Sequence, residues 1–389
     1  MLDQGKIHEF SGSHYEMGFQ QGTLFQDLVQ DALRVFKKLE DIQLMKPRFM
    51  PMCLFLWIAS RRAKNWLKPL IKSHAPNQAE RIRGMADGSG MSERLLYFFS
   101  AAELMLAKLD WELPHLETGC TSIAYGSAFT SRHHAMISRN FDYARFIVRF
   151  LMLRENAPDG HYKTFDLTAF PLPGTFNGLN EHGVFIATDE AFPVSEIEDG
   201  LSASLIIQEA LEKCASTEQV VQFFKNAPRG SGNVVLVADP SDDIRVLEYT
   251  SKQFHVREPD QGRNFIVATN HYASKELKSV DLPRGAVFGN KSPRGLRGIL
   301  INETSYVRKE RAESLLSSTK KVDVDFLQEL HRDHGSESPE KGGMNSICHH
   351  DPINVSAASM IVDLKSFDAW ICFGLPCENK YEKFNFKGS

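Results

Sequence analysis

The sequence lacks a long hydrophobic run. Its longest apolar stretch, MCLFLWIA at 52–59, is too short to span a bilayer and is closely followed by Arg61, Arg62 and Lys64. We interpret it as part of a buried helix; the alternative is a surface that meets a lipid-like acyl chain or a membrane face. The first residues, MLDQGKIHEFSGS, lack the apolar core of a secretory signal. We therefore expect a cytoplasmic protein with no stable membrane insertion.

The sequence also lacks an excess of charge. Lysine and arginine total 45 against 49 aspartates and glutamates, which gives a net charge of −4. Without a basic excess we expect no nucleic-acid partner. The 389 residues, 42% of them hydrophobic, can build a large core without a metal or disulfide staple. A homo-oligomer is compatible with this composition.

Several catalytic motifs are missing. The six cysteines form no CxxC pair and no zinc-finger spacing, so we interpret them as reduced thiols. HExxH is absent, and we expect no metal and no other cofactor. GSGN at 230–233 lacks the spacing of GxSxG, which disfavours a serine hydrolase. One alternative stays open, a histidine-based metallohydrolase with ligands from a scattered set: His331, His334, His349, His350 and Asp351.

Before residue 120 the apolar spacing predicts mainly helices. Ser13 and Glu16 have the spacing of a capping box at the start of one helix. A second helix is predicted over 76–85, with its proline in the first turn, and a third begins near Ser92.

After residue 120 the sequence favours strands. CTSIAYGSAF and HHAMISRNF predict a hairpin that turns at Ser131 and Arg132. Further strands are predicted at 164–170, 183–191, 232–240, 244–250 and 264–272, with a final hairpin near the C-terminus. Helices are predicted at 202–215, 217–227, 304–318 and 324–334. This order indicates an α+β fold of two stacked antiparallel sheets with helices outside.

Cys120 stands at the junction of the two regions. Gly119 permits backbone geometries that other residues cannot adopt, and a hairpin returns Arg139 and Asp142 to the side of Cys120. If the thiol attacks the Gly119–Cys120 peptide, the released amine has a pKa near 7.7–8.0 and can act as a base. The alternatives are a buried structural cysteine, a plain Arg139–Asp142 ion pair, and a turn cap at Asn270.

Several segments together resemble a known family. They are GSHYEMGFQQG, TGCTSIAYG with SRNFDY, NGLNEHGVFIATDEAF, VATNHY, SYVRKERAESLL and SICHH…SAASMIVDL…GLPC. In this order they resemble the acyl-coenzyme A:6-aminopenicillanic acid acyltransferases, which are N-terminal nucleophile hydrolases similar to the choloylglycine hydrolases. The resemblance spans nearly the whole chain.

The resemblance implies an αββα four-layer sandwich, made as a proenzyme and cut before the nucleophile Cys120. It divides the chain into a helical segment, 1–119, and a catalytic core, 120–389. It assigns Arg139 and Asp142 to holding the nucleophile and its amine, and Asn270 to the oxyanion. Arg308 is the match for a later arginine, with Arg311 close by.

One position departs from the family. Relatives tend to carry an asparagine at the end of the strand that reads GVFIATDEA here, where this chain offers Asp189 and Glu190. A carboxylate there would oppose a developing oxyanion unless it is protonated or turned away, and it could instead contact a cationic substrate group.

These observations predict a self-processing cysteine amidohydrolase or acyltransferase that acts on a small-molecule acyl amide or acyl thioester. Phe55, Trp57 and Trp66 are candidates for an acyl pocket, with ordinary core packing as the alternative. The rival prediction is an unprocessed, inactive binding or scaffold protein on the same fold.

Overall fold

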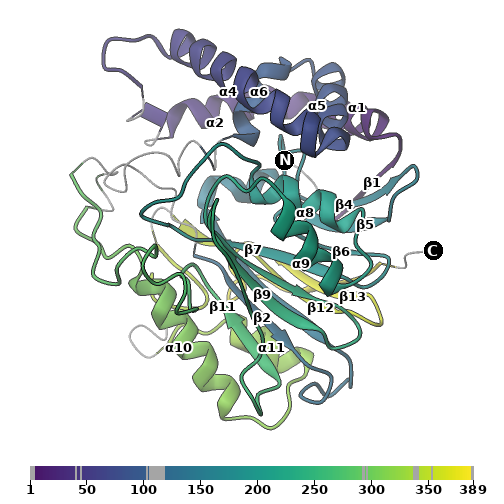
Figure 1. Cartoon of the computed structure of the whole chain (residues 1–389), viewed down its shortest axis with the longest axis vertical. Coiled ribbons are helices and arrows are strands. Elements are labelled where there is room, and N and C mark those ends of the chain that lie inside the picture. The colour runs from purple at the N-terminus through teal and green to yellow at the C-terminus, as the bar shows by residue number, and fades with distance from the viewer. Residues whose placement is uncertain are drawn as a thin grey trace.

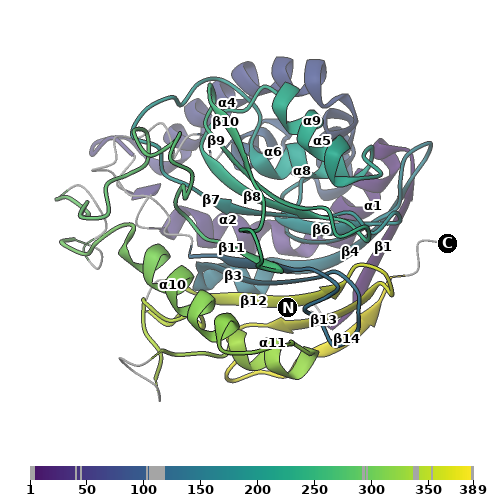
Figure 2. The same cartoon turned by 60° about the horizontal axis from the view of Figure 1, so that its bottom comes forward.

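The computed structural model describes residues 5–39, 42–43, 46–101, 104, 119–290, 294, 297–335, 341–351 and 354–386. Two β-sheets lie face to face at its centre, and helices cover their outer sides (Figures 1 and 2). The strand segments predicted from alternating apolar residues all form strands, because each one buries at least one face against a neighbouring layer.

The larger sheet has eight strands in the order β1-β4-β5-β6-β7-β8-β9-β10. All neighbours are antiparallel except β1 and β4, which pair in parallel. The strands are β1 (Ile7–Gly12), β4 (Leu151–Pro158), β5 (Thr164–Ala169), β6 (Asn177–Asn180), β7 (Phe185–Glu190), β8 (Asn233–Ala238), β9 (Ile244–Tyr249) and β10 (Phe254–Arg257).

The smaller sheet has six antiparallel strands in the order β11-β2-β3-β12-β13-β14. They are β2 (Thr121–Tyr125), β3 (Met136–Ala144), β11 (Phe265–Ala268), β12 (Asn354–Asp363), β13 (Asp368–Phe373) and β14 (Glu382–Asn385). The predicted hairpin around residue 131 is therefore confirmed as β2 and β3.

Four helices complete the layers. α8 (Ala203–Leu211) and α9 (Thr217–Asn226) pack on the eight-stranded sheet. α10 (Glu303–Ser317) and α11 (Val324–His331) pack on the six-stranded sheet, as Figure 2 shows. The predicted αββα sandwich is thus confirmed. The cap of α9 is Ser216, one residue before the predicted start.

The N-terminal helices form a further group at one end of the sandwich (Figure 1). They are α1 (His14–Leu24), α2 (Val29–Lys38), α4 (Met52–His74), α5 (Pro76–Ser89) and α6 (Glu93–Ser100), with short 3₁₀ turns at Gln26–Leu28 and, after β3, at Arg145–Phe150. The capping box of Ser13 and Glu16 is present. β1 departs from the helical prediction, because its six residues complete a sheet edge supplied by β4, far along the chain. None of the described helices combines the length and apolar character that a bilayer-spanning helix needs.

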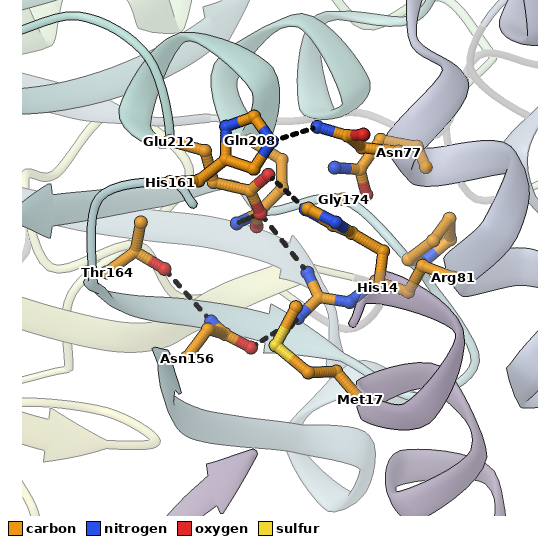
Figure 3. A network of polar contacts seen from close by, with 12 residues as sticks. His14, Met17, Asn77, Arg81, Asn156, His161, Thr164, Gly174, Gln208 and Glu212 are labelled. Atoms are coloured by element: carbon orange, nitrogen blue, oxygen red, sulfur yellow. Dashed lines mark hydrogen bonds and ion pairs between the residues drawn. The ribbon is translucent and has the colours of Figure 1, made fainter. Parts of the chain in front are cut away.

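A buried polar network fastens these helices to the sheet (Figure 3). His14 Nε2 of α1 lies 2.7 Å from Glu212 Oε2 at the end of α8. Arg81 of α5 donates to Asn156 of β4 across 2.5 Å, and its Nη1 lies 3.8 Å from Glu212 Oε1. All four side chains are buried, and burial lowers the pKa of Arg81 to about 10. A buried charge of this kind is stable only with its partners. The network therefore fixes the position of α1 and α5 against the eight-stranded sheet and α8.

Candidate active site around Cys120

The pairing of β2 with β3 places the candidate residues. Thr121 stands opposite Asn140 and Ser122 opposite Arg139. Continued by two residues, this register sets Gly119 beside Asp142. The structure agrees, because a Cβ on Gly119 would lie 3.2 Å from Asp142 Oδ2. The hairpin therefore carries Cys120, Arg139 and Asp142 to one point, as the sequence predicted.

The sulfur of Cys120 faces Arg139. Arg139 Nη2 donates to Cys120 Sγ across 3.2 Å, and the cysteine is 2% exposed. Burial raises the pKa of the Cys120 thiol to about 12, and the Arg139 charge acts in the opposite direction. Removal from water disfavours the thiolate, while a neighbouring cation favours it. In this arrangement Arg139 is the cation that can stabilise the reacting form of the sulfur.

Arg139 is itself held by the neighbouring sheet. Its Nη1 donates to Asn177 Oδ1 of β6 across 2.6 Å, and its Nη2 also donates to the Thr188 carbonyl of β7. Its Nε lies 3.5 Å from Asp189 Oδ1. These contacts fix the guanidinium at the sulfur. Sequence reasoning missed Asn177, although it begins the motif NGLNEHG that carries part of the family resemblance.

Asp142 faces the Gly119–Cys120 junction. Its Oδ1 accepts from Ser356 across 2.6 Å, while its buried Oδ2 has no hydrogen-bond donor among the described residues. Burial raises the pKa of Asp142, and the nearby His349 and Arg308 partly offset the effect. A buried carboxylate oxygen without a donor is costly in an otherwise paired site. This oxygen lies 3.2 Å from the position that a Cβ on Gly119 would take, next to the Gly119–Cys120 peptide.

Arg308 holds the backbone on the other side of Cys120. Its Nη1 donates to the Cys120 carbonyl and, across 2.9 Å, to Thr121 Oγ1, and its Nη2 donates to Asn270 Oδ1 across 3.0 Å. The Asn270 amide donates in turn to the Glu190 carbonyl across 2.9 Å. Arg311, the other candidate arginine, pairs instead with Asp333 across 2.7 Å.

Asp189 is turned into the site and away from solvent. It is fully buried, accepts from Ser122 across 2.9 Å and lies beside Arg139. Burial raises its pKa to about 6, against the effects of Arg139 and Ser122. Its position makes it a partner of Arg139. Glu190, the next residue, lines the large cavity described next.

A cavity of about 170 Å³ opens beside Cys120. Cys120 and Arg139 stand at its wall, and most of the remaining lining is apolar. The aromatic part of that lining is Phe36, Phe99, Phe141, Tyr143, Phe146, Phe150, Phe170 and Phe176. Residues from α2 and α6 thus line one side of the cavity, and residues from both sheets line the other. Phe55, Trp57 and Trp66 are absent from the described lining; Phe55 and Trp66 pack against the core, and Trp57 is 42% exposed.

A second, much smaller cavity lies on the Gly119 side of the cysteine. Gly119, Asn270, Thr304, Arg308 and His349 are among its lining residues. The structure brings His349 Nδ1 within 3.5 Å of a Cβ position on Gly119. Cys120 thus lines the large apolar cavity, and its neighbour Gly119 lines the small one.

The family model of the acyl-coenzyme A:6-aminopenicillanic acid acyl-transferases matches residues 130–376. The chain belongs to this family. The earlier resemblance is thereby confirmed, and membership supports an acyltransferase or amide hydrolase activity. The match includes Arg139, Asp142, Asn270 and Arg308 but begins after Cys120.

Individual relatives are distant. The chain is 21% identical over 245 residues to the beta-alanyl-dopamine/carcinine hydrolase of Drosophila melanogaster, covering 59% of this chain and 60% of that protein. A Caenorhabditis elegans ortholog of N-acylethanolamine-hydrolyzing acid amidase matches at 14% identity and a TM-score of 0.42, over 63% of this chain and 93% of that one. A variant of conjugated bile acid hydrolase from Clostridium perfringens matches at 14% identity and a TM-score of 0.44, over 69% of this chain and 98% of that one.

Proposed function

We propose that the protein is a self-processing cysteine amidohydrolase or acyltransferase whose nucleophile is Cys120. The observation that carries the proposal is the position of the Cys120 sulfur. It lies under the Arg139 guanidinium, at the wall of an apolar cavity, while Arg308 holds the carbonyl of the same residue. A structural cysteine needs neither a cation on its sulfur nor a cavity beside it.

The first reaction is cleavage of the Gly119–Cys120 bond. Sγ attacks the Gly119 carbonyl carbon, the C–N bond breaks, and the Cys120 nitrogen takes up the thiol proton. The resulting thioester is hydrolysed by water, which leaves a Gly119 carboxylate, a thiol and a free α-amine. The products are segments 1–119 and 120–389, and both line the apolar cavity.

The free amine then serves as the general base for turnover. An α-amine titrates near neutral pH, so it can accept the thiol proton directly. Asp142 Oδ2, which lacks a donor among the described residues, lies where it can hold that amine. Asp142 would thus orient the base in the way that the third member of a catalytic triad does.

The substrate would place an apolar acyl group in the large cavity. The lining favours an aromatic or alkyl group, bound as an amide or a thioester. Attack by Sγ gives an acyl-enzyme and releases the amine or thiol. Asn270 Nδ2 has two N–H groups, of which one is used at the Glu190 carbonyl. The second can donate to the substrate oxyanion, which preorganised amides stabilise strongly. The distant Drosophila relative is named a beta-alanyl-dopamine/carcinine hydrolase, which supports hydrolysis as the reaction and leaves the apolar acyl group to rest on the cavity lining.

The denatured mass of the purified chain tests the proposal. Cleavage gives pieces of 119 and 270 residues, or about 13 and about 30 kDa in proportion to length. We expect the larger piece to begin with Cys120, and Cys120→Ala to remain uncut and inactive toward a panel of acyl amides and thioesters. Cys214→Ala, which removes another buried cysteine, should still be cut. Normal turnover by the Cys120→Ala chain would overturn the mechanism, and a wild-type chain that stays whole at neutral pH would favour the binding-protein alternative.

A further inference from the structure

Four side chains that can ligate a metal meet outside the Cys120 site. Cys348 and His350 lie in the segment before β12, His334 follows α11, and Cys377 follows β13. One ligand atom from each lies within 4.8 Å of all the others. Within the described residues, this group shares His334 and His350 with the set considered from the sequence and includes neither His331 nor His349.

The spacing of the ligand atoms suits a tetrahedral ion. His350 Nε2 lies 3.3 Å from Cys348 Sγ and 3.3 Å from Cys377 Sγ. Zinc binds sulfur at about 2.3 Å and histidine nitrogen at about 2.0 Å, which places the ligands of a tetrahedral site roughly 3.3–3.8 Å apart. A small closure of the wider pairs would bring all four atoms onto one ion.

Hydrogen bonds to backbone carbonyls hold the ligand-bearing segments together. Cys348 N donates to the Asp333 carbonyl across 3.0 Å, which ties it to the residue before His334. His350 N donates to the Gly343 carbonyl across 3.1 Å. On the third side, Arg332 Nε donates to the carbonyl of Pro376, next to Cys377, across 2.8 Å. Preorganised ligands lose little freedom when an ion binds.

Gly342 makes room for the two imidazole rings. It has a φ of +65°, and a Cβ there would lie 2.5 Å from His350 Cδ2 and 3.0 Å from His334 Cδ2. The rings stand edge to face, with centroids 4.9 Å apart. A glycine at this point lets the backbone pass close to both histidines, and no larger residue would fit.

Hydrogen bonding alone does not account for the convergence. A neutral imidazole nitrogen has one lone pair, so His350 Nε2 cannot accept well from two thiols at once. Both cysteines are free thiols in the structure. Two thiolates and two neutral imidazoles are, in contrast, a complete ligand set for Zn²⁺, and their charges balance the ion when the two thiol protons are released.

We propose that His334, Cys348, His350 and Cys377 bind a structural Zn²⁺ ion. With four protein ligands the ion has no open position, so it would brace the fold and take no part in turnover. The ion would join the end of α11, the segment before β12 and the segment after β13, which are separated along the chain.

The same ion would fix one wall of the Cys120 site. His349 stands between two ligands in sequence, its Nε2 is 2.6 Å from Asp351 Oδ2, and its Nδ1 faces Gly119. By fixing residues 348 and 350, zinc would position His349 beside the junction that is proposed to be cleaved. This coupling rests on the proposed function; the metal site itself does not.

Metal content of the full chain tests the site. The protein is purified without chelator and dialysed, and its metal content is measured by inductively coupled plasma mass spectrometry. We expect one zinc per chain, and its loss in the double variant Cys348→Ser/Cys377→Ser. Cys214→Ala and Cys120→Ala are matched controls that should keep the zinc. Retention of zinc by the double variant would overturn the assignment.

Cobalt provides a readout that does not depend on a variant folding. Wild-type chain stripped by a chelator and loaded with Co²⁺ should show the visible absorption of a tetrahedral ion and sulfur-to-cobalt charge transfer. Thiol labelling should mark Cys377, which is partly exposed, in the stripped chain and spare it in the loaded one. A spectrum without sulfur ligation, or a Cys348–Cys377 disulfide in the non-reduced peptide map, would rule out the site. If zinc binds but its removal leaves the rate of cleavage unchanged, the coupling to His349 is wrong.

Discussion

Arg139 donates a hydrogen bond to the sulfur of Cys120 across 3.2 Å, from a guanidinium that the eight-stranded sheet holds on its other side. Cys120 directly precedes β2 and Arg139 lies on the paired strand β3, so the hairpin brings them together, and hydrogen bonds to Asn177 and the Thr188 carbonyl hold the guanidinium in place. The thiol is otherwise buried, and burial alone would keep it protonated.

Arg139→Gln should therefore slow the reaction of Cys120 with thiol reagents. Loss of the cation raises the thiol pKa further, and the thiolate fraction at a given pH falls about tenfold for each unit. We expect alkylation at pH 8 to slow by about tenfold or more, and Arg139→Lys to recover part of the rate. Alkylation of the single peptide that contains Cys120 is measured by mass spectrometry. An unchanged rate would show that Arg139 does not stabilise the thiolate.

Arg308 and Arg311 provide a matched pair of variants. Arg308 is fully buried and donates to the Cys120 carbonyl, whereas Arg311 pairs with Asp333 near the surface. Arg308→Met leaves the oxygens of Cys120 and Asn270 without their donor, so we expect cleavage to slow at least tenfold and the free energy of unfolding to fall by about 1–3 kcal/mol for each unpaired oxygen. Arg311→Met should change stability by about 1 kcal/mol or less. Denatured mass against time and thermal unfolding measure both effects. Equal behaviour of the two variants would contradict the assignment of Arg308.

The sequence could predict the residues that one hairpin brings together. Arg139 and Asp142 lie on β3, Cys120 directly precedes its partner β2, and alternation with a period of two is enough to indicate the pairing of the two strands. The same holds for the sandwich, because its strands and helices each carry their own apolar pattern. The N-terminal strand β1 was not predicted, since its partner β4 lies some 140 residues further on and edge pairing leaves little local signal.

The contacts between separate segments could not be predicted in this way. Asn177 reaches Arg139 from β6, and Ser356 reaches Asp142 from β12. The large apolar cavity is likewise lined by residues from α2, α6 and the 3₁₀ turn after β3. The apolar run at 52–59 is not part of that lining. A pattern within one helix shows which face is apolar, and it does not show which part of the core that face will meet.

Asn270→Ala should affect turnover more than cleavage. The variant removes a candidate oxyanion donor, and such losses typically reduce kcat by on the order of a hundredfold or more. Cleavage is a single intramolecular event in which the scissile bond is already held beside the sulfur, so a slower reaction can still finish. We expect a fully cut chain with low kcat. Asn385→Ala, which removes an amide that also donates to a backbone carbonyl but lies on β14, should turn over normally. An uncut Asn270→Ala chain would contradict this division of roles.

Asp189→Asn should change how stability depends on pH. Burial raises the pKa of Asp189 from 3.8 to about 6, so the folded state holds this proton more tightly than the unfolded state. Its contribution to the free energy of unfolding is therefore present at low pH and is lost as the pH rises from about 4 to about 6. Asparagine does not titrate. From pH 4 to pH 7 the free energy of unfolding of the variant should therefore rise relative to that of wild type by on the order of 1–3 kcal/mol.

Urea unfolding of the two chains, both carrying Cys120→Ala so that every molecule is uncut, measures this difference. Asp368→Asn is the control with the opposite sign. Hydrogen bonds from Asn385 and Lys383 and the charges of Lys383 and Arg132 lower the pKa of Asp368 despite partial burial, so its contribution is lost only as the pH falls below about 4. Between pH 4 and pH 7 the free energy of unfolding of the Asp368 variant should therefore depend on pH as that of wild type does. If the free energy of unfolding of Asp189→Asn and that of wild type change equally with pH, Asp189 stays ionised beside Arg139 throughout this range. It would then be a permanent counter-charge to the cation that donates to the Cys120 sulfur.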